Sequence, residues 1–326
     1  MKRNEASGLF TKSPRDRWRM DESWRLIAKE DALKFRARMI QAIRRFFLER
    51  DFLEIETPCR IPAPAPESHI EAVASGEWFL HTSPELCMKR LLAAGYPKIF
   101  QICRCFRGGE RGDRHLPEFT LLEWYRRGAD YLALMDDCEA LIGAVAEELG
   151  FAGEIPRQGR LIRLLPPWER LTVREAFARY APLTVSEALG SDRFEEIMAC
   201  AIEPCLGVER PVFLYEYPVA LGALARVKAG DPEVAERFEL YIGGMEMANA
   251  FSELNDAGEQ RRRFEEAVRS RRLQGGAVYP MPEPFLDALR HMHPSAGIAL
   301  GVDRLAMILA GKDKIDDVVA FTPEFL

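Results

Sequence analysis

The sequence predicts an α+β fold, an antiparallel sheet with helices packed on it. Strand-like runs are separated by long helical stretches and are mostly joined as hairpins, which favours antiparallel pairing. The 326 residues are 48% hydrophobic, enough for a substantial core, and no repeat or low-complexity tract interrupts the pattern. Residues 1–22 are polar and irregular, so we expect an N-terminal arm ahead of the folded part.

The first third of the chain predicts two units of helix and strand. The first helix carries apolar residues at helical spacing: Phe35, Met39, Ile43, Phe46 and Phe47. It ends near Asp51, and "FLEIETP" follows as a short strand that Pro58 stops. The prolines of "RIPAPAPESH" predict an extended loop, and "FLHTSPEL" leads from a strand into a helix that ends at Gly95.

The later segments continue the same alternation. We expect a helix over 130–149, then a strand, a proline turn and a helix capped by Thr172 in "RLIRLLPPWERLTVREAF". "RPVFLYEYP" predicts a strand, and "ERFELYIGGMEMANAFSELN" predicts a hairpin that turns at Gly243 and Gly244. A charged helix over 257–274 follows, and "SAGIALGVDRLAMILAG" goes from a strand into an apolar helix.

A charged, glycine-containing loop joins two strand-like runs in "RCFRGGERGDRHLPEFTLLEWYR", residues 104–126. Its glycines allow close backbone approach to a ligand, and its positive groups suit a polyphosphate; they are Arg107, Arg111, Arg114 and His115. Arg304 lies one turn into a helix, where free N–H groups attract anions. Such a loop can equally be a solvated hairpin.

Acidic, phenolic and amide side chains share strand faces with phenylalanines. Alternation places together Phe119, Leu121, Glu123 and Tyr125; Asn249, Phe251 and Glu253; and Glu239 and Tyr241. One interpretation is a half-exposed sheet face in water. The other is a pocket for a small amphipathic cation, with carboxylates for its ammonium groups and aromatic walls for its methylenes. Glu239 and Glu246 could hold Mg²⁺ through oxygen ligands, which together with the arginines would make an ATP clamp.

Composition narrows the function further. The net charge of −6 weighs mildly against nucleic-acid binding, because a polyanion would need a local basic patch. The arginines of "QRRRFEEAVRSRR" also fit a solvated helix face paired with Glu265 and Glu266. There is no apolar run long enough for a membrane span and no signal-peptide pattern, so we expect a cytoplasmic protein. The seven cysteines lack a C-x-x-C pair and are interpreted as reduced, packed thiols.

Several segments together resemble class II aminoacyl-tRNA synthetases. The first helix and strand to Pro58, the loop around Arg107, and "GIALGVDRL" resemble their motifs 1, 2 and 3 in order. "TSPEL", "HLPEFTLLEWY" and "ERFELYIGGMEMANAFSELND" are similar to the lysyl branch. The resemblance implies that residues 23–326 form one catalytic domain with the antiparallel sheet of that family. With only a short arm before motif 1 in place of an anticodon domain, the chain looks like the truncated paralogues that attach a lysyl group to translation elongation factor P.

The resemblance also implies roles for individual residues. Arg107 would grip the α-phosphate of ATP and Arg304 the γ-phosphate, so these two are the expected catalytic residues. Glu239 and Glu246 would bind Mg²⁺. The other residues expected at ATP are Gly109, Glu110, His115, Leu116, Phe119, Glu246, Met247 and Gly301, with Phe119 stacked on adenine. The residues expected at the amino acid are Ser83, Pro84, Glu85, Glu123, Tyr125, Asn249, Phe251, Glu253 and Ala299.

Four positions depart from the synthetase pattern. Gly109 stands at the glutamate of the usual Arg-x-Glu, and Leu116 replaces the asparagine of His-Asn-Pro. Ala250 stands where Ala-Asn-Gly-Phe has glycine, and Ala299 where motif 3 commonly has glycine. In the elongation factor P type, alanine at the motif 3 position accompanies a preference for (R)-β-lysine over α-lysine. Strand alternation also places Glu246 and Asn249 on opposite faces of the strand. If both side chains face the ligand, a bulge or the Gly243–Gly244 turn must redirect Glu246.

The implied activity is a two-step ligation. The carboxylate of lysine or (R)-β-lysine attacks ATP to give an adenylate, and a lysine amine of elongation factor P then forms an amide. Motif 1 is the dimer surface in resembling proteins, so a homodimer is expected. Two alternatives stay open: an enzyme that charges tRNA, disfavoured by the acidic balance, and a non-catalytic regulatory module, disfavoured because the phosphate arginines and acidic ligands are present.

Overall fold

A large, mostly antiparallel sheet runs through residues 24–326, which are the residues that this computed structural model describes. The sheet and its flanking helices confirm the α+β prediction. The expected arm at 1–22 lies outside the described residues. None of the helices in the described range is long and apolar enough to cross a membrane.

The main sheet is formed by strands from both halves of the chain. In spatial order they are β1 (Leu53–Glu54), β5 (Lys98–Phe106), β6 (Glu118–Arg127), β14 (Ser295–Gly301), β13 (Glu246–Ser252), β12 (Asp231–Tyr241), β10 (Val212–Pro218) and β9 (Glu169–Thr172), with β11 (Val227–Lys228) paired to β12. Only the outer pairs, β1 with β5 and β9 with β10, are parallel. Two small sheets contain β2 (Arg60–Ile61), β4 (Trp78–Leu80) and β3 (Ala74–Ser75), and β7 (Glu154–Arg157) and β8 (Arg160–Arg163).

Most helices lie over one face of the sheet or at its edges. The helices are α2 (Glu30–Leu48), α3 (Glu85–Ala93), α4 (Tyr131–Glu148), α5 (Val173–Tyr180), α6 (Val185–Gly190), α7 (Phe194–Ile197) with a π-helix at Met198–Ile202, α8 (Ala257–Leu273), α9 (Glu283–Leu289) and α10 (Val302–Leu309). Of these, α3 packs on the other face against β5 and β6. Short 3₁₀ turns occupy Glu203–Cys205, Val219–Leu221, Ile315–Val318 and Pro323–Phe325.

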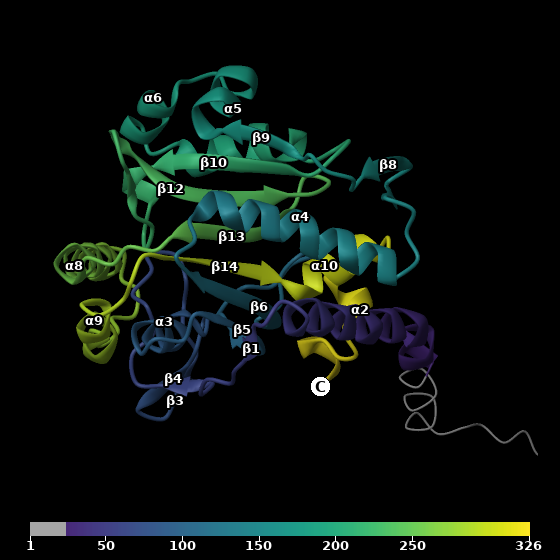
Figure 1. The fold of residues 1–326 in the computed structure, drawn as a ribbon, viewed down its shortest axis with the longest axis horizontal. Helices are drawn as coiled ribbons and strands as arrows, with labels where there is room; N and C mark the ends of the chain where they lie inside the picture. The colour runs from purple at the N-terminus through teal and green to yellow at the C-terminus, as the bar shows by residue number, and fades with distance from the viewer. Residues whose placement is uncertain (1–23) are drawn as a thin grey trace, which may run out of the picture.

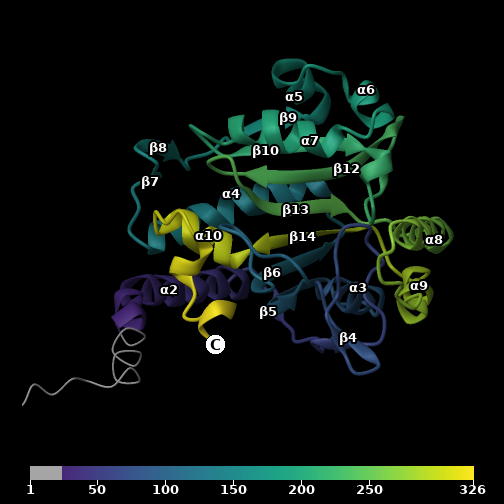
Figure 2. The ribbon, with the colours of Figure 1, turned by 180° about the vertical axis from the view of Figure 1, so that it is seen from behind.

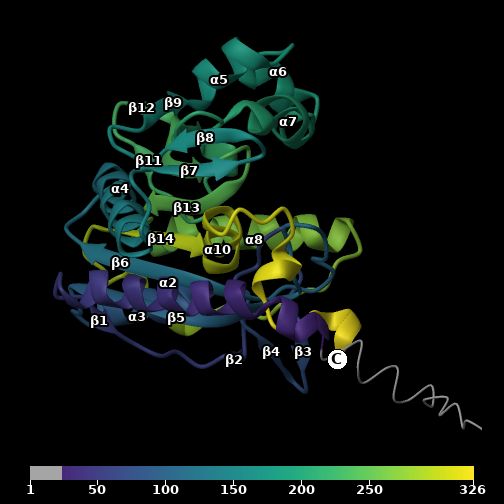
Figure 3. The ribbon, with the colours of Figure 1, turned by 90° about the vertical axis from the view of Figure 1, so that its right-hand side faces the viewer.

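The main core lies between the sheet and α2, α4 and α10. Figure 1 shows α4 crossing in front of the sheet, and the buried side chains of these helices pack against Leu122, Trp124, Leu240 and Ile298. From behind, Figure 2 shows the opposite face of β12, β13 and β14, with α8 and α9 at one edge. Figure 3 shows α5, α6 and α7 gathered at the β9 end, where they form a second core. The opposite face of the central strands is therefore left for the polar residues.

Local sequence signals place most of these elements where they were predicted. Thr172 caps α5 in a reciprocal capping box with Glu175, because each side chain bonds the other residue's backbone N–H. Asp130 and Asp256 cap α4 and α8 without a reciprocal bond. Their side chains accept hydrogen bonds from free N–H groups of the first turn. The hairpin of β12 and β13 turns through Gly243 and Gly244, both at positive φ.

Two interpretations of the sequence are corrected. All seven thiols are free, but Cys59, Cys200 and Cys205 are exposed, so they are not packed in the core. On α8, Arg262 does lie on a solvated face with Glu259 and Glu266, yet Arg271 is buried. Helical periodicity could not reveal this, since the groups that cover Arg271 come from distant parts of the chain.

Candidate active site

Two cross-strand rows bring the expected residues together on the face opposite the main core. Residues paired across neighbouring strands project to the same face of a sheet. The first row runs through Gln101, Glu123, Ala299, Asn249 and Glu239, and the second through Tyr125, Gly297, Phe251 and Arg237. Strands from three distant segments thus supply one continuous polar surface.

A bulge settles the orientation of Glu246. Leu240 pairs with Ala248, but the next residue, Tyr241, pairs with Glu246, so the register shifts by one on β13. A bulge of this kind reverses the alternation of side chains. Glu246 therefore joins the face that carries Asn249, as its expected role requires.

Lys89 lies at the centre of one end of the surface. Its side chain is 1% exposed and forms ion pairs with Glu85, at 2.6 Å, and with Glu253. Its Nζ lies 4.8 Å from the centre of the Phe251 ring, a cation–π distance. The four groups make an amine-binding arrangement in which the protein's own ammonium contacts the residues expected to hold a substrate amine. We call this the amine end of the site.

Hydroxyl groups hold the Glu123 carboxylate in the same region. Ser83 donates to Oε1 of Glu123 at 2.5 Å, and the Tyr125 hydroxyl donates to Oε2 at 2.7 Å. Ser83 Oγ in turn accepts from the backbone N–H of Glu85 at 3.0 Å, just after Pro84, the N-cap residue of α3. The carboxylate is thus fixed in orientation without a positive partner among these contacts.

The amine end has more carboxylates than cations to balance them. Burial raises the pKa of Glu123 to about 8, and the nearby Glu85 adds to the rise. Burial also raises the pKa of Glu253 to about 8, even though Lys89 opposes the shift. For Lys89 itself, burial would lower the pKa, but Glu253 and Glu85 outweigh it and the pKa is raised. A cationic ligand would relieve this imbalance.

Glu67 is a further acid of this region that sequence reasoning missed. Burial raises its pKa to about 7, opposed by Arg107 and reinforced by Glu85, which identifies its charged neighbours. Glu67 lies in the proline-rich loop. Its backbone carbonyl accepts a hydrogen bond from Nη1 of the buried Arg271 at 2.7 Å. No pattern around "APESH" signals a site, because the loop is brought there by Arg271 of α8.

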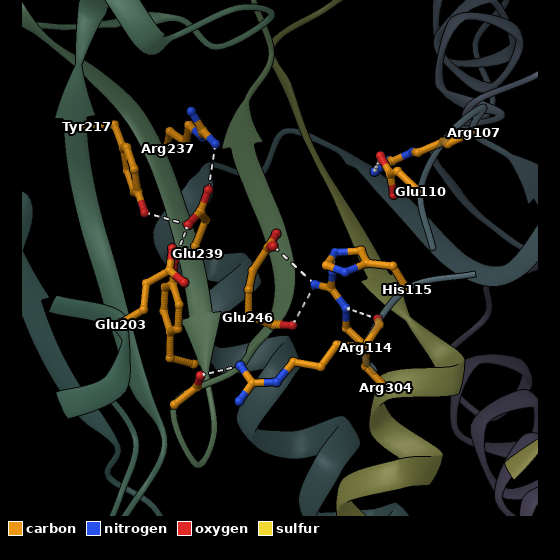
Figure 4. A network of polar contacts seen from close by, with 12 residues as sticks. Arg107, Glu110, Arg114, His115, Glu203, Tyr217, Arg237, Glu239, Glu246 and Arg304 are labelled. Atoms are coloured by element: carbon orange, nitrogen blue, oxygen red, sulfur yellow. Dashed lines mark hydrogen bonds and ion pairs between the residues drawn. The ribbon is translucent and has the colours of Figure 1, made fainter. Parts of the chain in front are cut away.

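Arg304 organises the other end of the surface. Figure 4 shows its guanidinium between His115 and Glu246: Nη2 lies 2.5 Å from Nε2 of His115, and Nη1 donates to the Glu246 backbone oxygen at 2.9 Å and its carboxylate at 3.1 Å. Burial and then Arg304 lower the pKa of His115, so the ring is neutral at pH 7. Arg304 follows Gly301, the N-cap residue of α10, as expected. We call this the anion end.

Arg107 lies in the loop between β5 and β6, between the two ends. Its Nε donates to the Thr82 carbonyl at 3.4 Å, and its guanidinium carbon lies 5.1 Å from the centre of the Phe119 ring. Glu110 forms a loose ion pair with Arg107, at 3.8 Å. Its carboxylate therefore lies beside the arginine, whereas Gly109 has no side chain that could do so. Gly109 has φ of 76°, which favours glycine.

Asp303, which the sequence analysis did not select, positions the helix that carries Arg304. It is 2% exposed, and its Oδ1 accepts from Nη2 of Arg36 at 2.6 Å while Oδ2 accepts from the Thr120 N–H at 2.6 Å. These bonds tie α10 to α2 and β6. In the sequence, the only feature that could have pointed to Asp303 was its position next to Arg304.

Glu239 and Glu246 fit a divalent cation. Figure 4 shows them on neighbouring strands, with Arg237 beyond one and Arg304 beyond the other. Glu239 accepts from the hydroxyls of Tyr217 at 2.6 Å and Tyr241 at 2.7 Å, and from Arg237 at 2.6 Å. Burial raises the pKa of Glu239 although Arg237 opposes the rise, and Glu246 adds to it. For Glu246, burial would raise the pKa, but Arg304 outweighs it and the pKa is lowered. Carboxylate oxygens are the ligands that Mg²⁺ prefers.

Two of the residues expected at ATP have their side chains in the main core. Leu116 is 4% exposed and Met247 is 1% exposed, both among the buried residues that pack on α2, α4 and α10. Any contact that they make to a nucleotide must therefore come from backbone atoms. Arg237, which the sequence analysis left out, instead donates to the Asn249 side chain at 3.1 Å within the site.

Comparisons with known proteins identify a family and several relatives of this chain. Residues 20–324 match the family described as tRNA synthetases class II (D, K and N). A protein of Salmonella arizonae named elongation factor P (R)-β-lysine ligase is 39% identical over 319 residues, covering 92% of this chain and 97% of that protein. Proteins of the same name from Salmonella paratyphi B and Salmonella heidelberg show the same identity and coverage.

Proposed function

Since this chain belongs to the class II tRNA synthetase family of the D, K and N enzymes, we propose that it is an ATP-dependent ligase for elongation factor P. It activates lysine or (R)-β-lysine as an adenylate and transfers the lysyl group to a lysine side chain of that factor. The names of the relatives from three Salmonella strains support the acceptor and the β-lysine substrate.

The observation that carries the proposal is the charge imbalance of the amine end. Three carboxyl groups, those of Glu85, Glu123 and Glu253, lie at the amine end with one buried ammonium, that of Lys89, while Glu67 nearby has Arg107 as its main cationic influence. A ligand with two ammonium groups would balance this excess, whereas an ordinary neutral amino acid would leave buried carboxylates unpaired. Lysine and β-lysine both carry two such groups. The Phe251 and Tyr125 rings provide apolar surface for the methylenes between them.

The anion end suits the first chemical step. An oxygen of the amino-acid carboxylate attacks the α-phosphorus of ATP, and the bond to the β-phosphate bridging oxygen breaks, releasing pyrophosphate. Arg107 would balance charge at the α-phosphate and Arg304 at the γ-phosphate, so catalysis rests on positioning and electrostatics. Phe119, beneath Arg107, offers a face for adenine. Held by Glu239 and Glu246, Mg²⁺ would supply further charge neutralisation on the polyphosphate.

The second step makes an amide. The neutral amine of the acceptor lysine attacks the acyl carbon of the adenylate, the bond to the phosphate oxygen breaks, and AMP leaves with its electron pair. An acceptor lysine is a compact cation until it loses its proton, so the acidic surface around the amine end would favour its approach. The acceptor is a translation factor, and we therefore place the reaction in the cytoplasm.

The decisive experiment supplies both candidate acceptors. The purified protein is incubated with ATP, Mg²⁺ and (R)-β-lysine or α-lysine, with elongation factor P in one arm and tRNA in the other. We expect a gain of one lysyl mass on a single lysine of the factor and no acid-precipitable label on tRNA. Labelled tRNA with an unmodified factor would instead assign a tRNA synthetase. Arginine and ornithine, tested by ATP–pyrophosphate exchange, should not be activated.

A further inference from the structure

Two cysteines and a histidine gather beside the site, and none of them has a part in the proposed reaction. Cys103 and Cys105 are two residues apart on β5, so they share a face, and their sulfurs lie 3.8 Å apart. Nε2 of His81 lies 4.0 Å from Sγ of Cys105. One ring nitrogen of His81 and both sulfurs lie within 4.8 Å of one another. His81 is 1% exposed and Cys105 fully buried, while Cys103 is partly open.

The distances match those of a tetrahedral metal centre. Two thiolates bound tetrahedrally at about 2.3 Å from Zn²⁺ are about 3.8 Å apart, and a thiolate and an imidazole nitrogen about 3.5 Å. The two sulfurs are already at that spacing, and Nε2 of His81 lies about 0.5 Å beyond it from the Cys105 sulfur. The same Nε2 lies 2.6 Å from the Arg104 carbonyl oxygen, so a metal bound at Nε2 would replace that hydrogen bond.

The two sulfurs face each other and the imidazole, and no disulfide joins them. Thiolate is the form of cysteine that binds metals, so binding would release the thiol protons. Sulfur and imidazole select a softer ion than the carboxylate pair Glu239 and Glu246, so the two sites would not compete for the same metal.

We propose that His81, Cys103 and Cys105 form a binding site for a thiophilic divalent metal ion, Zn²⁺, with a fourth position open to water on the Cys103 side. Sites with three protein ligands and one open position are common for this ion. The sequence lacks a C-x-x-C pair, and the histidine lies 22 positions before Cys103, so only the packing of β5 against the segment after β4 assembles the three ligands.

Occupation of this site would act on the neighbouring catalytic residues. The Phe106 N–H donates to the His81 carbonyl at 3.0 Å, and the Arg107 Nε donates to the carbonyl of Thr82. Across the strand pair, Cys105 faces Phe119. A metal that draws the His81 ring toward the sulfurs would therefore move the backbone that supports Arg107, and we expect Zn²⁺ to inhibit adenylate formation.

The test uses the full chain, reduced and freed of metal with a chelator. Zn²⁺ is titrated with native mass spectrometry and calorimetry as readouts, and Co²⁺ serves as a spectroscopic probe. We expect one ion per chain, with sulfur-to-cobalt charge-transfer bands of a tetrahedral thiolate site. Cys103→Ser and Cys105→Ser should each weaken binding by more than about tenfold. Cys200→Ser, at an exposed cysteine, is the matched control and should bind as the parent does.

Several outcomes would overturn the site. They are the absence of a thiolate band with Co²⁺, unchanged Zn²⁺ affinity in folded Cys103→Ser, or a Cys103–Cys105 disulfide forming under mild oxidation with no metal uptake by the reduced chain. Thermal melts verify that the variants fold. Zn²⁺ should inhibit pyrophosphate exchange by the parent but not by Cys103→Ser. The binding readouts need no catalysis, so they stand whether or not the proposed ligase activity is correct.

Discussion

At the scale of single residues, Lys89 explains how a pocket built for amines remains stable without one. A buried cluster of carboxylates is costly unless a cation compensates it. Lys89 supplies that charge to Glu85 and Glu253, but it leaves Glu123 paired only with hydroxyls. Because its pKa is raised to about 8, Glu123 is largely protonated at pH 7 until a cationic substrate arrives.

Glu253→Gln should strongly weaken the activation of lysine. Removing one carboxylate leaves Lys89 and the substrate amine to share Glu85, and breaking a buried ion pair typically costs about 3–5 kcal/mol, more than a hundredfold in binding. Pyrophosphate exchange at varied lysine concentration measures the effect. Glu233→Gln, an exposed acid on β12, is the control and should match the parent. Full activity of Glu253→Gln would remove Glu253 from the amine end.

Amine binding should strengthen as pH rises from about 6 to about 8. The pKa values of Glu123 and Glu253 are raised to about 8, so both acids are largely protonated at pH 6 and must lose a proton to pair with an ammonium. Each released proton contributes up to about a tenfold gain in affinity per pH unit below that pKa. Calorimetry in buffers of different ionisation enthalpy counts the protons. An affinity independent of pH, with no proton release, would contradict the charge imbalance.

At the scale of elements, the loop that carries Glu67 is fastened at both ends to other parts of the molecule. Arg271 of α8, only 3% exposed, donates to the carbonyls of Glu67 at 2.7 Å and Ile70 at 2.9 Å and pairs with the Glu71 carboxylate. The Glu71 carbonyl accepts from the N–H of Gly108, in the loop between β5 and β6, at 2.7 Å. The loop thus connects α8 to the Arg107 segment.

Arg271→Lys should therefore raise KM for the amino acid and lower the melting temperature. A lysine ammonium lacks the planar fork that reaches two carbonyls and a carboxylate at once, so buried acceptors lose their partners at about 1–3 kcal/mol each. Arg272→Lys changes the adjacent, exposed residue in the same way and should have little effect. If both variants behave alike, the loop does not depend on Arg271.

Strand β14 approaches the site so closely that only glycine fits at one position. A Cβ at Gly297 would overlap the Tyr125 ring and the Glu253 carboxylate. Gly297→Ala should abolish lysine activation while leaving a folded protein, because the clash falls on the site face. Gly143→Ala in α4, where a Cβ meets nothing within 4 Å, should activate lysine normally. Pyrophosphate exchange and circular dichroism separate the two effects.

At the scale of the whole molecule, the charge distribution favours a protein acceptor over a nucleic acid. The net charge is −6. On α8, Arg262 and Arg263 pair with Glu259 and Glu266, Arg261 pairs with Glu283, and Arg271 holds the loop at Glu67. Binding to tRNA would require clustered cations that release counterions from many phosphates. A single lysine side chain that approaches an acidic pocket requires no such cluster of cations.

We also propose that the molecule is a homodimer through α2 and β1. Leu48 is 56% exposed and Leu53 49% exposed, although both are large and apolar. A Leu48→Glu, Leu53→Glu double variant should elute as a monomer in size-exclusion chromatography with light scattering, where the parent is a dimer. Leu161→Glu alters another exposed leucine, on β8, and should leave the dimer intact. A monomeric parent would refute the assembly.

The sequence by itself determined what depends on near neighbours along the chain. Strand alternation predicted the shared face of Glu123 and Tyr125, cap residues such as Thr172 predicted helix starts, and the order of the motifs predicted the family. Parity alone also predicted that a bulge or the Gly243–Gly244 turn must redirect Glu246, and the register shift between Glu246 and Ala248 provides the bulge. Periodicity and capping are local, so these features can be recognised from short windows of sequence.

Only the tertiary structure decided which distant groups meet. Asp303 bonds Arg36 across 267 positions, and Arg271 reaches Glu71 across 200. Glu67 enters the amine end from a loop that carried no site pattern, and Lys89, on the helix that begins with Glu85, was not selected from the sequence. The same packing joins His81 to Cys103 and Cys105, and puts the side chains of Leu116 and Met247 in the core. Such contacts follow from strand register and helix packing, which are set by the burial of the whole core and not by the residues beside each group.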